Sequence, residues 1–203
     1  MVTWSGDDTS NRAISHNLTV TPELLITKRR TTNFDGWWSQ YTGIFGTNTG
    51  IRLDQISGLT TGVSAFSGTS AATSSAFYVG SDSSINASSN DYIAFLFATL
   101  PGISKVGSYT GTGGSFNVDC GFTAGARFVL IKRTDGDGNW RVYDTARGIV
   151  AGNDPYLHLN NSTDVEVTNN DGIDPYNQGF SITGSANFDI NAVGGNYIFL
   201  AIA

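Results

Sequence analysis

The chain has 203 residues, of which 39% are hydrophobic and 14% are charged, and its formal net charge is −6. This acidic balance argues against nucleic acid and against anionic membrane surfaces as partners, because both attract proteins through a basic face. Charged residues fall well below the roughly 25% of an average soluble domain. Only two glutamates occur, and serine, threonine, asparagine and glycine are abundant, which favours strands and turns over helices.

In chain order, the first predicted strands are short runs separated by turn residues. They are "TWSG" (Thr3–Gly6), "ELLITKR" (Glu23–Arg29), "IRL" (Ile51–Leu53), "FYVG" (Phe77–Gly80) and "DYIAFLFA" (Asp91–Ala98). The run Glu23–Arg29 predicts a strand buried on both faces, with the lysine and arginine at its end emerging into solvent. Asp91–Ala98 is the strongest run and is expected at the centre of a sheet. "TSAATSSA" (Thr69–Ala76) comes nearest to a helical pattern, but its composition favours a loop.

The same blocks return about 105 residues later, in the same order. Thr3–Gly6 falls on "SYTG" (Ser108–Gly111), and "HNLTVTPELLITKR" (His16–Arg29) falls on "CGFTAGARFVLIKR" (Cys120–Arg133). Trp38 and Tyr41 fall on Trp140 and Tyr143, in the alternating strand "WRVY". "FYVGSDSSINAS" (Phe77–Ser88) falls on "FSITGSANFDINAV" (Phe180–Val193), and "DYIAFLFA" falls on "NYIFLAIA" (Asn196–Ala203). A register kept through so many blocks indicates an internal duplication.

Each copy therefore supplies roughly six short strands in about 100 residues, which is the spacing of an antiparallel β-sandwich. We predict an all-β, lectin-like or jelly-roll-like fold built from two β repeats, residues 1–101 and 102–203. The join Thr99–Lys105 is too short for a flexible linker, which favours closely packed copies. One merged sandwich and two stacked domains both fit this pattern.

The longest motifs resemble a domain that recurs in bacteriophage structural proteins, especially in tail-associated and fibre-like chains of marine phages. They are "YIAFLFATLPGISKVGSYTGTGG" (Tyr92–Gly114), "FVLIKRTDGDGNWRVYDTARG" (Phe128–Gly148) and "INA…NYIFLAIA" at the end of the chain. The resemblance implies a lectin-like β-sandwich located on a virion, and it carries no catalytic residues. In the first copy, "GWWSQYTGIFG" (Gly36–Gly46) lacks the aspartate and arginine of "YDTAR", so a role for Asp144 and Arg147 would belong to the second copy alone.

Three polar patterns are candidate sites. Asp144 and Arg147 stand three apart after a strand, where they can grip a ligand or form a salt bridge that fixes the turn before Gly148, the more ordinary role. Asp135, Asp137 and Asn139 alternate as at the start of a calcium loop, but the distal glutamate is missing and a hairpin turn with two glycines explains them more simply. Asp164 and Glu166 share a strand face at roughly 7 Å, where a carboxylate pair could serve a glycosidase, although a solvated strand face is the more ordinary interpretation.

The aromatic residues suggest a contact surface, since exposed rings stack on sugars and populate interfaces. Trp38 and Trp140 are expected in the core, and Trp37 is the tryptophan expected to touch a ligand or partner. Tyr156 and Tyr176, each after an Asp-Pro pair, are expected in loops as further contacts.

The remaining reactive residue types give no catalytic or metal pattern. His16 and His158 stand in non-equivalent places with no second ligand at zinc spacing. Cys120 is the single cysteine and is expected to be a small buried residue. No apolar run approaches the roughly 18 residues of a membrane span, and the N-terminus has no signal-peptide pattern. We therefore expect neither cofactor nor metal, and no membrane insertion.

The sequence thus predicts a non-enzymatic phage virion protein, a tail, fibre or surface β-sandwich that assembles with other virion proteins and self-associates. Attachment to a host-surface glycan fits the same reading. Two alternatives stay open: a carbohydrate-binding, lectin-like module outside or on a virion, and a polysaccharide depolymerase that uses Asp164 and Glu166.

Overall fold

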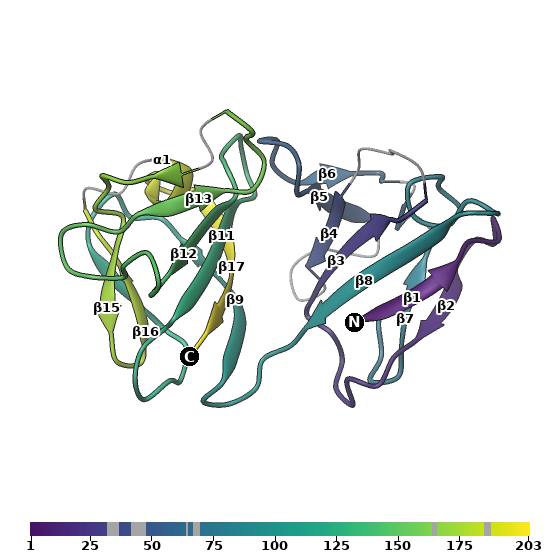
Figure 1. Ribbon diagram of the computed structural model, residues 1–203, viewed down its shortest axis with the longest axis horizontal. Coiled ribbons are helices and arrows are strands. Elements are labelled where there is room, and N and C mark those ends of the chain that lie inside the picture. The colour runs from purple at the N-terminus through teal and green to yellow at the C-terminus, as the bar shows by residue number, and fades with distance from the viewer. Residues whose placement is uncertain (32–36, 42–47, 64, 67–69, 164–165, 185–187) are drawn as a thin grey trace. The chain divides into compact units, whose positions relative to one another are not determined.

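The computed structural model describes residues 1–31, 37–41, 48–63, 65–66, 70–163, 166–184 and 188–203; for residues 37–41 and Phe188 it describes the backbone alone. Two compact units result (Figure 1). The first contains Met1–Asp54 and Leu59–Ala98, and the second contains Gln55–Gly58 and Thr99–Ala203. The chain changes unit on either side of Gln55–Gly58 and again between Ala98 and Thr99, and this last change lies close to the boundary expected from the repeat. None of the helices in these ranges is long and apolar enough to span a membrane.

The first unit combines a six-stranded sheet with a two-stranded one, and all pairs are antiparallel. The large sheet has the order β1-β8-β3-β4-β5-β6, and the small sheet pairs β2 with β7. The bounds are β1 Val2–Ser5, β2 Arg12–Ser15, β3 Leu24–Arg29, β4 Trp37–Tyr41, β5 Thr49–Arg52, β6 Thr60–Thr61, β7 Ala76–Val79 and β8 Asp91–Phe97.

The second unit repeats this plan and adds one strand. Its large sheet has the order β9-β17-β11-β12-β13-β14, and its small sheet has the order β10-β16-β15. The bounds are β9 Ser104–Thr110, β10 Phe116–Asp119, β11 Phe128–Arg133, β12 Arg141–Asp144, β13 Tyr156–His158, β14 Glu166–Val167, β15 Ile173–Tyr176, β16 Gly179–Ile182 and β17 Asn196–Ile202, with one helical turn, α1 Phe188–Asn191. Strand β15 has no counterpart among the described strands of the first unit.

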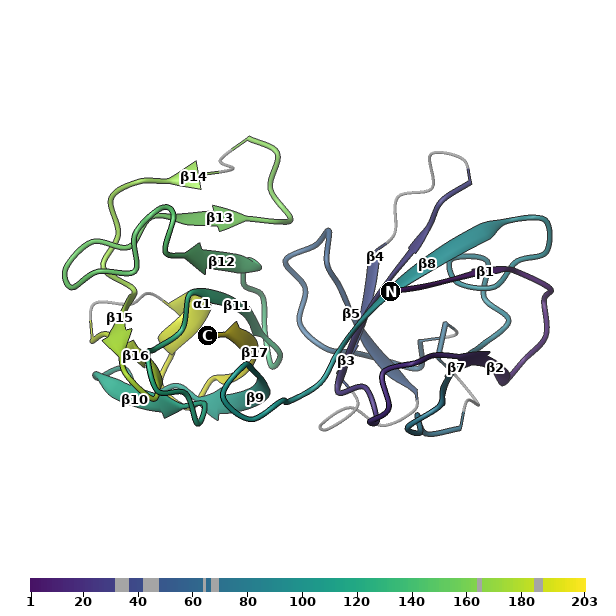
Figure 2. The ribbon, with the colours of Figure 1, turned by 60° about the horizontal axis from the view of Figure 1, so that its bottom comes forward.

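In both units the core lies between the large and the small sheet, which makes each a sandwich (Figure 2). Ile14, Phe77 and Val79 of the small sheet of the first unit pack with Leu25 and Tyr92 of its large sheet. In the second unit, Val118, Phe180 and Ile182 of the small sheet likewise pack with Val129, Ile131 and Phe199 of the large sheet. The all-β antiparallel sandwich expected from composition and strand spacing is therefore confirmed.

The strand "YIAFLFA" and its repeat lie inside their sheets, each with a partner on both sides. Strand β8 lies between β1 and β3, and β17 lies between β9 and β11. Both lie next to an edge strand rather than in the middle of the sheet, because each sheet is extended on one side only. The added strands are β4, β5 and β6 in the first unit and β12, β13 and β14 in the second.

Strand pairing corrects the alignment of the two tryptophan segments. Ile26 and Leu130 hold the same place in β3 and β11, and they lie opposite Ser39 and Val142 respectively. Two residues before these partners stand Trp37 and Trp140. Trp37, and not Trp38, is therefore the counterpart of Trp140, and a register change of one residue exchanges the faces of a strand.

The end of β11 also departs from the expectation. Arg133 is half-buried, but Lys132 is 0% exposed and does not emerge into solvent. Its ammonium donates hydrogen bonds to the carbonyl oxygens of Ile56 at 2.6 Å and Gly138 at 2.5 Å, both within the second unit. Burial lowers the pKa of Lys132 to about 8. The local run predicted the strand correctly, but burial of the lysine depends on one carbonyl in the turn that follows the strand and on another that lies 76 residues earlier in the chain.

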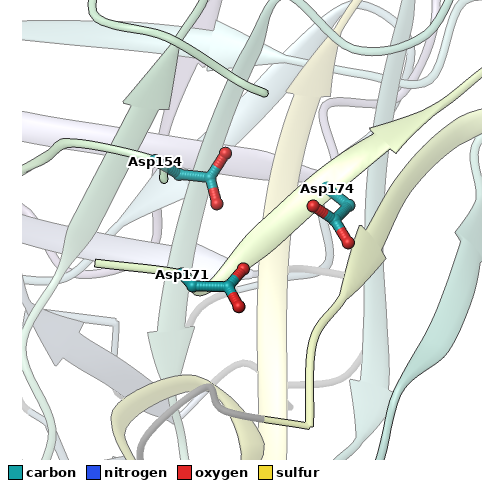
Figure 3. A group of neighbouring side chains, drawn as sticks. All are labelled: Asp154, Asp171 and Asp174. Carbon is teal, nitrogen blue, oxygen red and sulfur yellow. The ribbon is translucent and has the colours of Figure 1, made fainter. Parts of the chain in front are cut away.

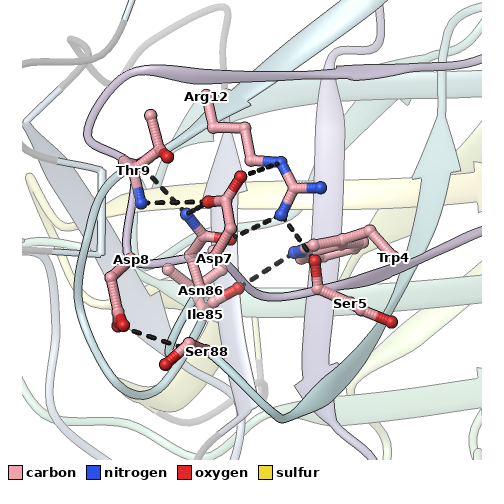
Figure 4. A network of polar contacts seen from close by, with 9 residues as sticks. All are labelled: Trp4, Ser5, Asp7, Asp8, Thr9, Arg12, Ile85, Asn86 and Ser88. Atoms are coloured by element: carbon pink, nitrogen blue, oxygen red, sulfur yellow. Dashed lines mark hydrogen bonds and ion pairs between the residues drawn. The ribbon is translucent and has the colours of Figure 1, made fainter.

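A buried asparagine fixes the loop after the first strand of each unit. Asn86 is 0% exposed, and its amide nitrogen donates to Asp7 Oδ1 at 3.2 Å and to the carbonyl of Thr9 at 2.9 Å (Figure 4). Arg12 joins this network through the Asp7 carboxylate, at 3.3 Å, and Asn86 Oδ1, at 3.1 Å. The backbone N–H of Thr9 and the other donors around it lower the pKa of Asp7.

Asn191, the repeat counterpart of Asn86, does the same in the second unit. Its Oδ1 accepts from the N–H groups of Thr112 at 3.0 Å and Gly113 at 3.1 Å. Its amide nitrogen donates to the carbonyl groups of Gly114 at 3.1 Å and Thr183 at 2.9 Å. The repeated "INA" therefore has a structural cause: its asparagine supplies donors and acceptors to a loop whose own backbone groups would otherwise be unsatisfied.

Candidate functional site

The outer face of the three-stranded sheet in the second unit carries a row of polar side chains. Ser181 of β16 lies opposite Asn117 of β10 on one side and Asp174 of β15 on the other. Alternate residues such as Phe180 and Ile182 point into the core. The Ser181 hydroxyl donates to Asn117 Oδ1 at 2.6 Å. Asn117 is exposed, whereas Ser181 and Asp174 are half-buried.

Tyr176 extends this face, because it follows Asp174 by two residues on the same strand. Its ring is half-buried, and its hydroxyl hydrogen-bonds to Gln178 Oε1. Tyr176 thus lies at the end of β15 and not in a loop as expected. Its ring remains partly accessible, so a ligand or partner can reach it.

Asp174 also belongs to a group of three carboxylates at the edge of this face. Asp154, Asp171 and Asp174 can each place an oxygen within 4.8 Å of the others. Figure 3 shows the carboxylates of Asp154 and Asp171 pointing toward β15, which carries Asp174. Asp154 is 0% exposed, and its two oxygens accept from the N–H groups of Val150 at 2.9 Å and Ile173 at 3.2 Å.

The group is electrostatically unfavourable when all three members are charged. Burial, with smaller contributions from the neighbouring Asp174 and Asp171, raises the pKa of Asp154 to about 6 in spite of the two backbone hydrogen bonds, which act to lower it. Oδ1 of Asp174 is buried and accepts no hydrogen bond from the described residues. Such a group can take up a proton at mildly acidic pH, and its oxygens are of the kind that bind divalent cations.

The turn predicted as the start of a calcium loop has other contacts. Asp135 forms an ion pair with Arg133 at 2.8 Å, and Asp137 is exposed. Asn139 donates to Asp189 Oδ2 at 3.2 Å and accepts from Asn160 at 2.9 Å. Within the described residues, the carboxylates that converge are those of Asp154, Asp171 and Asp174 instead.

Asp144 and Arg147 form the local salt bridge that was the simpler of the two expectations. The Arg147 guanidinium contacts the Asp144 carboxylate, which also accepts from the Arg147 N–H at 2.9 Å. Glu166 lies 3.2 Å from Arg147 Nε. Asp164 lies outside the described residues, so the proposed pairing of Asp164 and Glu166 is not observed.

The two remaining aromatic candidates have different outcomes. The backbone of Trp37 begins β4, and its side chain lies outside the described residues. Tyr156 was expected in a loop but lies in β13 and is 4% exposed. It packs on Tyr143 and His158, with the Arg141 guanidinium 4.2 Å from its ring centre, so it is a core residue and not a contact.

Arg141 was not predicted as a special residue. It is 1% exposed and donates through Nη2 to Asp189 Oδ2 at 2.8 Å and through Nη1 to the Tyr143 hydroxyl at 3.5 Å. In the first copy, the positions of Arg141 and Asp189 are held by Trp38 and Ser84. This paired difference between the copies is the signal that could have revealed the ion pair.

The core expectations for Trp140 and Cys120 are confirmed, whereas the side chain of Trp38 lies outside the described residues. Trp140 is 1% exposed, and burial raises the pKa of Cys120 to about 12, which keeps its thiol protonated. His16 and His158 are both buried. None of these described side chains forms a nucleophile and base pair.

The match to a family model covers residues 1–203, the whole chain. The chain belongs to the family described as "Domain of unknown function (DUF7483)". No curated protein and no solved structure matches it. Both repeats lie inside this family match.

Proposed function

We propose that this protein is a non-enzymatic component of a bacteriophage particle, a surface-exposed β-sandwich module that assembles with other virion proteins and contributes to host attachment. The motifs shared with phage structural proteins motivate the proposal. The observation that supports it is that the same sandwich, with its loop clamped by Asn86 or Asn191, is built twice in one chain. A rigid scaffold that presents loops and a sheet face is suited to binding.

Several described polar side chains of types that often serve in catalysis are engaged in ion pairs instead, which also favours a binding role. Arg147 forms ion pairs with Asp144 and with Glu166. Arg141 and Asp189 form a buried pair that holds α1 to β12. These groups brace the fold, and their contacts suit a stable module better than a reaction centre.

A carbohydrate-binding role is the second candidate, and one observation favours it. The row Asn117, Ser181 and Asp174 with Tyr176 beside it offers hydrogen-bonding groups and an aromatic ring on one accessible face. This role is compatible with a virion location, since host attachment often begins with a surface glycan.

The test of the virion proposal is the protein's presence in purified particles. Particles of a phage that encodes this chain are banded in a density gradient and digested for mass spectrometry, and intact particles are labelled with antibody and gold. Banding of the chain with the particles and surface labelling would support the proposal. Loss of the chain from particles that keep their tail proteins would refute it. Sedimentation of the purified chain, in which we expect an oligomer, tests self-association separately.

A further inference from the structure

We propose that the outer face of the sheet β10-β16-β15 binds a neutral, hydroxyl-rich glycan through Asn117, Ser181 and Asp174, with Tyr176 as the ring against which a sugar packs. This inference rests on the host-attachment part of the proposed function and names its ligand class and its residues.

The first argument is that the fold does not require these side chains. Val118 and Ile14 hold the same place in the two copies, because each lies opposite an equivalent phenylalanine, Phe180 and Phe77. Their neighbours Asn117 and Ala13 are therefore equivalent, and so are the cross-strand partners Ser181 and Tyr78. The first copy forms the same strand pair with Ala13 and Tyr78, so the polar pair is a feature of the second copy alone.

The second argument is the added strand. Strand β15 pairs with the free edge of β16 and brings Asp174 into line with Ser181 and Asn117. Adjacent strands lie roughly 4.8 Å apart, so the row spans roughly 10 Å, a length comparable to a disaccharide. The same strand brings Tyr176 onto this face.

The third argument is the hydrogen-bonding capacity of the row. Asn117 Oδ1 accepts from Ser181, which leaves the Asn117 amide nitrogen without a partner in the described part of the chain. Oδ1 of Asp174 is buried, so Asp174 offers its other carboxylate oxygen as an acceptor for a sugar hydroxyl, and Ser181 supplies an oxygen that accepts one more. Donors and acceptors placed side by side match the vicinal hydroxyl groups of a sugar, while aromatic rings pack on the apolar face of the sugar ring.

The fourth argument is charge, which selects among glycans. Asp119 is exposed on the same face, and Asp171 and Asp154 lie against Asp174. The chain as a whole carries −6. Like charges oppose each other across an interface, so uronate-bearing and phosphate-bearing polymers are disfavoured and neutral sugars are favoured.

The experiment uses the full chain on an array of bacterial surface glycans with neutral and uronate-bearing members, followed by calorimetric titration of the best neutral ligand. We expect saturable binding to neutral members. Asn117→Ala and Asp174→Asn should each weaken it at least tenfold, and Tyr176→Ala should weaken it as well.

The matched control is Tyr78→Ala in the first copy, which should leave affinity unchanged. Because Asn117 is exposed, its variant is expected to fold, and an unchanged near-ultraviolet circular dichroism spectrum verifies this.

Four outcomes would overturn the inference: no binding to any neutral glycan, preference for uronate-bearing members, equal affinity in wild type and Asn117→Ala, or equal loss in Tyr78→Ala. The proposed function is judged separately. Particles that carry the Asn117→Ala chain but no longer adsorb to glycan support both, whereas absence of the wild-type chain from particles refutes the virion role whatever the array shows.

Discussion

Trp4 and Tyr109 occupy equivalent places in the two units, and each donates a hydrogen bond to the carbonyl of an equivalent buried isoleucine. The Trp4 indole nitrogen lies 3.1 Å from the Ile85 oxygen, and the Tyr109 hydroxyl lies 2.9 Å from the Ile190 oxygen. Each ring also stacks on a tyrosine of the neighbouring strand, Trp4 on Tyr92 at 5.4 Å and Tyr109 on Tyr197 at 5.0 Å. Two different aromatic residues thus perform one structural task.

Removing the donor at one of these positions is expected to destabilise the unit that contains it. Tyr109→Phe keeps the ring but leaves the Ile190 carbonyl without its donor, which costs about 1–3 kcal/mol for a buried group. The measurement is chemical denaturation, with hydrogen exchange of β9 and β17 as the local readout. Tyr176→Phe, whose hydroxyl lies on an accessible face, serves as control. Equal stability of the two variants would contradict this account of the repeat.

The asparagine clamps predict a loss of stability when either of them is replaced. Asn191→Asp loses two donated hydrogen bonds and places a charge at a 3% exposed site, so we expect a loss of about 3 kcal/mol in the free energy of unfolding. Asn86→Asp should cost about as much, because its new carboxylate oxygen would replace a nitrogen that lies 3.2 Å from Asp7 Oδ1. This repulsion offsets the attraction of the Arg12 guanidinium, which lies 3.1 Å from Asn86 Oδ1 and already pairs with Asp7.

Hydrogen exchange of the loops Gly6–Thr9 and Gly111–Gly114 would measure the two clamp effects separately. A clearly smaller loss of protection in the first loop would show that the attraction of Arg12 outweighs the repulsion from Asp7, and no loss in either loop would contradict the clamp.

The sequence predicted those parts of the fold that depend on local pattern and repetition. The runs Leu24–Arg29 and Phe128–Arg133, and the strands that follow them, recur in the same order, and the sheets have the same strand order as a result. The alignment failed by one residue at Trp38, because two adjacent tryptophans leave the register open until the pairing of Ile26 with Ser39 fixes it.

The site residues were predicted less well, because their environment depends on distant partners. Tyr156 follows Asp-Pro and resembles a loop residue, but Arg141 and Tyr143 from β12 enclose it. The carboxylate group of Asp154, Asp171 and Asp174 joins two Asp-Pro segments with the turn between them, and only folding brings these together. Asn117 and Ser181 differ in polarity from Ala13 and Tyr78, which hold the same places in the first copy. Only the strand register shows that these residues are equivalent.

The buried pair of Arg141 and Asp189 predicts a strong coupling between strand β12 and helix α1. Arg141→Met leaves the Asp189 carboxylate buried without its cation, and Asp189→Asn leaves the guanidinium uncompensated. Breaking a buried pair of this kind costs about 3–5 kcal/mol. The double variant should be more stable than the sum of the two losses implies, because neither charge is then left alone. Thermal and denaturant unfolding of the four proteins gives the coupling energy, and additive losses would show that the two groups do not interact.

The raised pKa of Asp154 predicts an unusual pH dependence of stability. Its pKa of about 6 in the folded state lies above the ordinary value of 3.8, so between these values the folded chain binds more protons at this site than the unfolded chain. The contribution of Asp154 to stability is therefore fully present below pH 3.8 and is lost as the pH rises through about 6, a change of up to about 3 kcal/mol. Carboxylates with lowered pKa values, such as Asp54 and Asp135, act in the opposite direction, so wild type must be compared with a variant.

Asp154→Asn removes the titration and the repulsion from Asp171 and Asp174. We expect its stability relative to wild type to rise between pH 4 and pH 7 and to stay constant above pH 7. Denaturant unfolding across this range measures the difference, and a difference that does not change with pH would mean that Asp154 is ionised throughout.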